Sequence, residues 1–122
     1  MSIETVVNEC VERYFRAIVE LRNEGYNIVV LGAHPSTTSG HDDGRDTPVF
    51  GECLFRNNIA IQYNSKLKEL CLKENIIFIS IFVKLVDSNN ITKMEYYMDY
   101  CHLNSNSHPY MIEEFKNKGI IK

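Results

Sequence analysis

The chain has 122 residues, of which 44% are hydrophobic and 24% charged, and its formal net charge is −3. This length allows one domain at most, and the acidic balance argues against nucleic-acid or anionic-membrane partners, which need concentrated positive charge. No apolar run approaches the roughly 18 residues that span a bilayer, and the polar start of the chain is unlike a secretory signal. We therefore expect a cytoplasmic protein whose four separated cysteines are free thiols.

A helix is predicted over residues 3–24, where apolar side chains recur at steps of three and four. Ser2 is a suitable N-cap, and Gly25 can take the left-handed conformation that ends a helix. The predicted apolar stripe consists of Ile3, Val7, Cys10, Tyr14, Ile18 and Leu21, widened by Val6, Val11 and Phe15.

Two short apolar runs, at residues 26–32 and 76–82, predict strands that are buried on both faces and therefore parallel. Between them, residues 52–74 predict a second helix. Its apolar face would carry Ile59, Tyr63, Leu67 and Leu70, and Cys71 also falls on the apolar side. Helix, strand, helix, strand is the alternation of an α/β fold.

The remaining segments are predicted to be mostly irregular. A polar loop runs from residue 34 to about residue 50, and loops of this length in compact domains are usually functional or disordered. Beyond the second strand we expect a helical turn over 83–87, a turn at 88–90, and a short helix capped by Thr92 that runs through Tyr97. A last helix is expected over 110–118, after Pro109.

Two strands and three helices make only half of a doubly wound sheet, because parallel strands need both faces and their edges covered. Residues 1–122 are therefore predicted to form a single, partial α/β domain. Either more chain completes it, or the strand edge pairs with another molecule, for example in a homo-oligomer.

The clearest chemical pattern is Asp99-x-x-His102, on a polar loop before the last helix. One turn of chain can bring the carboxylate to one imidazole nitrogen, which fixes the tautomer and leaves the other nitrogen free as a general base. The tetrapeptide alone is weak evidence, because Asp99 could equally cap a turn while His102 lies on the surface.

Several segments in order give this pattern a context: LRNEGYN before IVVLGAHPS, then a long helix before IIFISIF, and finally MDYCHLN close to the chain end. In this order they resemble the C-terminal part of the SGNH/GDSL hydrolases. The resemblance implies the C-terminal half of a flavodoxin-like sheet, with His102 as general base and Asp99 as its orienting acid. It also implies a small-molecule or carbohydrate ester as substrate, an acyl-enzyme intermediate and no cofactor.

The chain departs from the family in lacking its Gly-Asp-Ser nucleophile motif, and no counterpart of its oxyanion glycine or Gly-x-Asn motif is present. We therefore expect little or no esterase activity from these residues alone. Ser36 or Ser39 could approach His102, or could simply form the loop. Cys101 is expected to point away from the base and to be inert.

The loop around residues 41–46 leaves other roles open. Arg45 could meet an anionic group, and His34 and Ser36 could line the substrate site with it. A metal-binding loop using His34, His41, Asp42, Asp43 and Asp46 is a weaker alternative to a solvated acidic loop.

His108 is expected to cap the last helix or lie on the surface. We expect Tyr96, Tyr97, Tyr100 and Tyr110 to pack rather than to bind sugar. The second hypothesis for the whole chain is a non-catalytic binding or assembly module.

Overall fold

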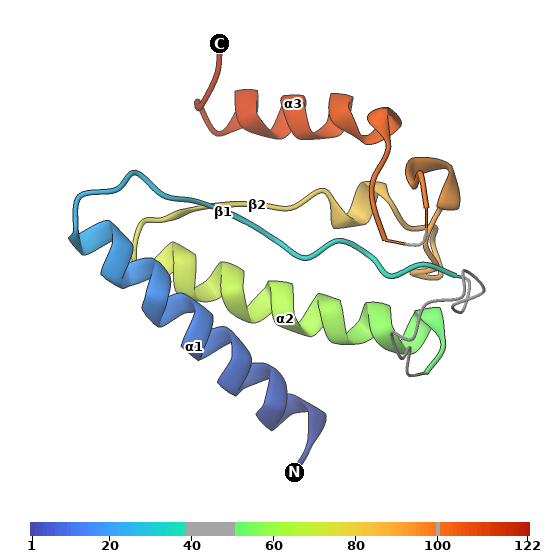
Figure 1. Cartoon of the computed structure of the whole chain (residues 1–122), viewed down its shortest axis with the longest axis horizontal. Helices are drawn as coiled ribbons and strands as arrows, with labels where there is room; N and C mark the ends of the chain where they lie inside the picture. The colour runs from blue at the N-terminus through green and yellow to red at the C-terminus, as the bar shows by residue number, and fades with distance from the viewer. Residues whose placement is uncertain (39–50, 100) are drawn as a thin grey trace.

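The computed structural model describes residues 1–38, 51–99 and 101–122. Within them the chain folds as an α/β unit of three helices and two strands, in the predicted alternation (Figure 1). The helices are α1 (Ile3–Asn23), α2 (Cys53–Lys73) and α3 (His108–Asn117), and the strands are β1 (Val29–Leu31) and β2 (Ile77–Ile79). Short 3₁₀ turns cover Phe82–Lys84, Met94–Tyr96 and Ser105–Ser107.

The two strands pair in parallel, with Val30 opposite Phe78, and α2 forms the crossover between them. Helices α1 and α2 lie together on one side of the strands, and α3 lies on the other side (Figure 1). The core lies between α1, α2 and the strands. Its most buried side chains include Val11, Val30 and Leu67.

Helix α1 begins and ends as predicted, but its buried stripe is narrower. Ser2 Oγ accepts a hydrogen bond from the Thr5 backbone N–H, and Gly25 has a φ of 99°. The buried residues are Val7, Val11, Phe15 and Ile18, whereas Ile3, Val6, Cys10, Tyr14 and Leu21 are not. The prediction of a wide stripe was wrong because α1 packs chiefly on α2, and one neighbouring helix covers only a narrow face of it.

Helix α2 packs its predicted face on the core, with Leu67 fully buried and Ile59, Tyr63 and Leu70 partly buried against it. Three further buried residues on the same helix were not predicted: Cys53, Asn57 and Asn64. They lie in line with the predicted Leu67 and Cys71.

Both strands are shorter than the apolar runs that predicted them, at three residues each. After β1 the chain continues with one more ladder bond, from Gly32 N–H to the Ile79 carbonyl, and then turns to side chains of α2 for its hydrogen bonds. After β2, Ile81 and Phe82 remain buried although they have left the sheet. The end of the apolar run therefore supplies buried residues after the chain has left the sheet, and a pattern of hydrophobicity cannot distinguish these from strand residues.

The segment after β2 contains the predicted turn at residues 88–90, where Asn90 donates its backbone N–H to the Asp87 carbonyl at 3.0 Å. The expected helix capped by Thr92 is wrong. Only a 3₁₀ turn forms, with Lys93 in the capping position, because the Thr92 side chain is buried and bonds to the backbone carbonyl of Ser36 instead.

The outer edge of β1 is open among the described residues. In the observed parallel register, Val30 and Gly32 turn their backbone groups toward β2, so those of Val29 and Leu31 point away from it. The side chains of Val29 and Leu31 are 39% and 45% exposed. This is the unfinished sheet that the sequence predicts. None of the helices in the described parts of the chain is long and apolar enough to cross a membrane.

Candidate functional site

A tight loop over residues 97–103 carries the candidate site. Tyr97 and Leu103 pair as an isolated antiparallel bridge, and the Met98 backbone N–H donates to the His102 carbonyl at 2.9 Å. Asn104 closes the base of the loop by donating its backbone N–H to the Tyr96 carbonyl at 2.8 Å. The loop is therefore held at its base by backbone hydrogen bonds.

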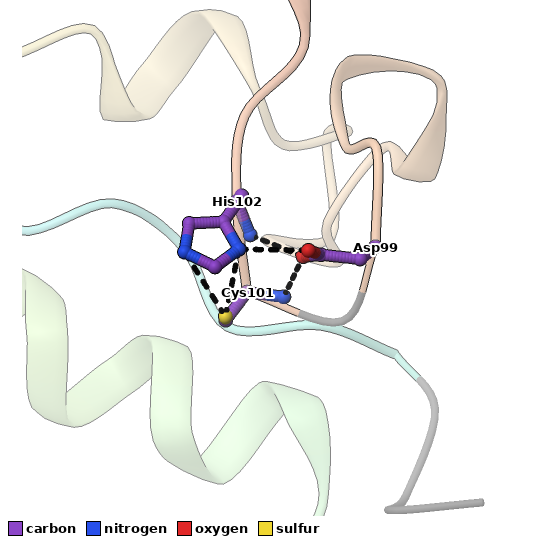
Figure 2. Close-up of side chains that lie close together, drawn as sticks. All are labelled: Asp99, Cys101 and His102. Atoms are coloured by element: carbon purple, nitrogen blue, oxygen red, sulfur yellow. Dashed lines mark hydrogen bonds and ion pairs between the residues drawn. The ribbon is translucent and has the colours of Figure 1, made fainter. Parts of the chain in front are cut away.

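The loop brings Asp99 and His102 together, as expected from their spacing. Asp99 Oδ2 lies 2.7 Å from His102 Nδ1, while Asp99 Oδ1 accepts backbone N–H groups from Cys101 at 2.8 Å and His102 at 2.6 Å (Figure 2). The carboxylate is thus fixed by three contacts. The His102 side chain is 66% exposed, so the imidazole is available to a partner group.

These contacts also favour the charged form of the carboxylate. The backbone N–H of Cys101, the His102 side chain and the backbone N–H of His102 together hold the pKa of Asp99 well below its usual value. An ionised Asp99 accepts the Nδ1 proton of a neutral His102, which leaves the lone pair on Nε2. This tautomer is the one that a general base requires.

Cys101 does not point away from the base, contrary to the expectation from its place next to His102. Its Sγ lies 3.3 Å from His102 Nδ1 and 3.9 Å from Nε2 (Figure 2). The tight loop folds the two neighbouring side chains onto the same side. The thiol approaches most closely the nitrogen that already faces Asp99, whereas a nucleophile in a triad contacts the opposite nitrogen.

The loop is anchored beside the chain that leaves β1. The buried Tyr97 donates its hydroxyl to the Pro35 carbonyl. Burial, and then repulsion from Cys53, raises the pKa of Tyr97 to about 12, so the phenol stays neutral and remains a donor. The Asp99–His102 pair therefore lies at the carboxyl end of the parallel strands, where open α/β sheets bind ligands.

Side chains of α2 also hold the segment that follows β1, residues 33–37, which we call the exit segment. Asn64 bonds to both backbone groups of Ala33, its Oδ1 accepting the N–H at 2.7 Å and its Nδ2 donating to the carbonyl at 3.0 Å. Asn57 accepts the Ser36 N–H at 2.7 Å and donates to the Asn90 carbonyl at 2.8 Å and to Thr92 Oγ1 at 3.0 Å.

Arg56 adds a third anchor. Its Nε donates to Ser36 Oγ at 2.6 Å, and its other nitrogens donate to the carbonyls of Thr37 and Gly51. The sequence analysis missed these positioning residues. The available signal was two asparagines seven residues apart, Asn57 and Asn64, in line with Leu67 and Cys71 on one face of α2.

The weaker site predictions have mixed outcomes. Ser36 is committed to Arg56, Asn57 and Thr92, and no hydrogen bond joins it to His102. His34 is exposed, and desolvation by the surrounding chain lowers its pKa. Ser39, Arg45, Tyr100 and the predicted metal loop of His41, Asp42, Asp43 and Asp46 lie outside the described residues.

The remaining tyrosines pack, as expected. Tyr96 and Tyr110 meet edge to face, with ring centroids 5.6 Å apart and their hydroxyls hydrogen-bonded at 2.9 Å. His108 is exposed at the start of α3. A groove between α1 and α2, lined by Val7, Phe55 and Ile59 among others, includes neither Asp99 nor His102.

Comparison with known proteins supports this architecture. A solved structure, from a Streptococcus pneumonia protein provisionally described as a platelet activating factor, matches 92% of this chain with a TM-score of 0.67 and 19% identity. The match covers 51% of that protein. The chain has the fold of half of a larger α/β domain. No family model matches the sequence, and a search of curated proteins found no significant match.

Proposed function

We propose that this chain supplies the histidine–aspartate half of a serine-type ester hydrolase site. The observation that carries the proposal is the 2.7 Å contact between Asp99 Oδ2 and His102 Nδ1, with the imidazole open to solvent at the carboxyl end of the strands. An oriented, solvent-accessible imidazole is suited to remove a proton from a hydroxyl nucleophile.

In this mechanism His102 Nε2 takes the hydroxyl proton as the nucleophile attacks the ester carbonyl. Asp99 stabilises the imidazolium that forms, because its carboxylate is already fixed by two backbone N–H groups. The imidazolium then returns the proton to the leaving alcohol, and an acyl-enzyme remains for water to hydrolyse.

The nucleophile and the oxyanion donors are proposed to come from residues outside these 122, on a longer form of the chain or on a partner. Two observations support this. The matched structure is about twice as long as the matched region, and the outer edge of β1 is open among the described residues. A further parallel strand beside Val29 and Leu31 would end next to the segment over 34–36, close to His102.

We propose a small acyl ester as the substrate class, with O-acyl groups on a carbohydrate as the narrower proposal. His34 lies on the exit segment that Tyr97 ties to the catalytic loop, through the neighbouring Pro35. It would border the mouth of the completed site, where it could contact the acyl or alcohol group.

Labelling with a serine-reactive fluorophosphonate tests the proposal. A form of the protein that includes the other half should label, and His102→Ala should slow labelling by at least about a thousandfold. His108→Ala is the matched control, because it removes another exposed histidine, and it should label like the wild type. Labelling of the His102→Ala protein at the wild-type rate would refute the role of His102. Labelling of these 122 residues alone would refute the proposal that the nucleophile lies outside them.

The second candidate function is a non-catalytic assembly module. It is favoured by the open edge of β1 and by the lack of any hydroxyl group hydrogen-bonded to His102 among the described residues. It predicts a stable oligomer in size-exclusion chromatography with light scattering, without hydrolysis of aryl esters. A well-folded monomer would count against this function.

A further inference from the structure

Three metal-binding side chains converge on the loop that holds the candidate site. Asp99, Cys101 and His102 each offer one donor atom, and the three donors lie within 4.8 Å of one another. We propose that these three residues form a binding site for a borderline-soft divalent metal ion of the zinc class. No metal site was predicted here from the sequence, and Cys101 was expected to point away from His102.

The spacing of the donors is close to that of a tetrahedral zinc site. Ordinary zinc–ligand bond lengths place sulfur and nitrogen about 3.5 Å apart, and nitrogen and oxygen about 3.4 Å apart. The observed distances are 3.3 Å from Cys101 Sγ to His102 Nδ1 and 2.7 Å from His102 Nδ1 to Asp99 Oδ2. An ion therefore requires the Nδ1–Oδ2 separation to widen by about 0.7 Å, and the separation of Cys101 Sγ from the carboxylate, which is within 4.8 Å, to settle at about 3.6 Å.

The mixture of donors selects the metal. A thiolate, an imidazole and a carboxylate together suit zinc and cobalt, whereas magnesium and calcium prefer oxygen ligands alone. All three residues are exposed, so the ion can enter from solvent and keep water in a fourth position.

The loop already positions the carboxylate for this task. Asp99 Oδ1 is held by the backbone N–H groups of Cys101 and His102, which leaves Oδ2 free to exchange its hydrogen bond with Nδ1 for a metal bond. Support of this kind orients ligands in known metal sites. The bridge between Tyr97 and Leu103 fixes the ends of the same loop.

Metal binding changes which atoms of Cys101 and His102 carry protons. Cys101 releases its thiol proton to solvent, and the single proton of neutral His102 moves from Nδ1 to Nε2, through solvent, so that Nδ1 can coordinate the ion. A neutral imidazole must then carry its single proton on Nε2. Nε2 is the nitrogen that the proposed hydrolase uses as a base, so the ion would inhibit that reaction. This consequence rests on the proposed function, whereas the binding itself does not.

Cobalt titration of the 122-residue protein, followed by absorption, tests the binding without any activity assay. We expect one cobalt per chain, with a sulfur-to-cobalt charge-transfer band and the d–d bands of a four-coordinate ion, and displacement of both by zinc. Cys101→Ser should abolish the charge-transfer band, and His102→Asn should weaken binding by at least about tenfold. Cys10→Ser is the control, because Cys10 is an exposed thiol on the remote helix α1.

The inference is overturned if no charge-transfer band forms at millimolar cobalt, or if the Cys101→Ser protein keeps the band. Circular dichroism of each variant establishes that the fold is intact. In a form of the protein that includes the nucleophile, zinc should inhibit fluorophosphonate labelling in the wild type. Cobalt binding without labelling would reject the hydrolase proposal alone, and labelling without cobalt binding would reject the metal site alone.

Discussion

Replacement of Asn57 by alanine is expected to destabilise the protein far more than the same replacement at its neighbour Asn58. Asn57 is fully buried, and its amide makes one hydrogen bond to the Ser36 N–H, one to the Asn90 carbonyl and one to Thr92. Asn58 is exposed on the same helix. The two variants therefore share helix and residue type, and differ in burial.

The magnitude follows from the three contacts. Each buried hydrogen bond contributes about 1 kcal/mol. In the alanine variant the Ser36 backbone N–H and the Asn90 carbonyl lose their hydrogen bonds to the Asn57 amide. Alanine recovers roughly 0.5 kcal/mol of helix propensity. We expect a loss of about 2.5 kcal/mol at Asn57, which corresponds to a fall in Tm of roughly 10 °C for a domain of this size.

Urea denaturation followed by circular dichroism measures the difference. The Asn57→Ala midpoint should fall at an unchanged m-value, and Asn58→Ala should stay within about 0.5 kcal/mol of the wild type. Equal stability of the two variants would show that the buried amide does not hold the exit segment of β1, and the reasoning about that segment would fail.

Three further changes test other parts of the fold. Leu67→Ala in the core should cost about 2–5 kcal/mol, whereas Leu72→Ala, at a side chain 67% exposed on the same helix, should cost less than about 1 kcal/mol in urea denaturation. Leu31→Lys on the open edge of β1 should lower any concentration-dependent mass seen by light scattering without unfolding the chain, and an unchanged mass would exclude association through that edge. The Tyr97 phenol ionises near pH 10 when unfolded but near 12 when folded, so its contribution to stability is complete below pH 10 and is lost as the pH rises toward 12. Tyr97→Phe should therefore lose less stability than the wild type in alkaline urea titrations. Tyr96, whose pKa is raised to about 12 mainly by its hydrogen bond to Tyr110, remains in both proteins, and parallel curves would refute the assignment to Tyr97.

Local patterns predicted the order of helices and strands and the meeting of Asp99 with His102. Both depend on short sequence distances: a helical stripe repeats every three or four residues, and the two side chains are three residues apart. The ends of the strands were not predictable in this way. Ile81 and Phe82 are as apolar as strand residues, and only the three-dimensional path shows that they are buried outside the sheet.

The polar anchors required tertiary information. Asn57 and Asn64 are buried because the exit segment of β1, more than 20 residues away in sequence, brings unpaired backbone groups to their amides. The placement of Cys101 depended on the shape of one tight loop, in which two backbone N–H groups turn toward Asp99 Oδ1. Adjacent residues usually diverge in extended chain, so the sequence suggested the opposite arrangement.

The hydrogen bonds that hold the loop of Asp99 and His102 and the β1 exit segment come from α2, from Thr92 and from Tyr97. Under the proposed function, the Asp99–His102 pair of such a half is already ordered, so association with the other half would cost docking entropy but little loop ordering. On that proposal, the two halves expressed as separate inactive polypeptides would regain turnover on association, which would make the fold a basis for a complementation reporter of protein association.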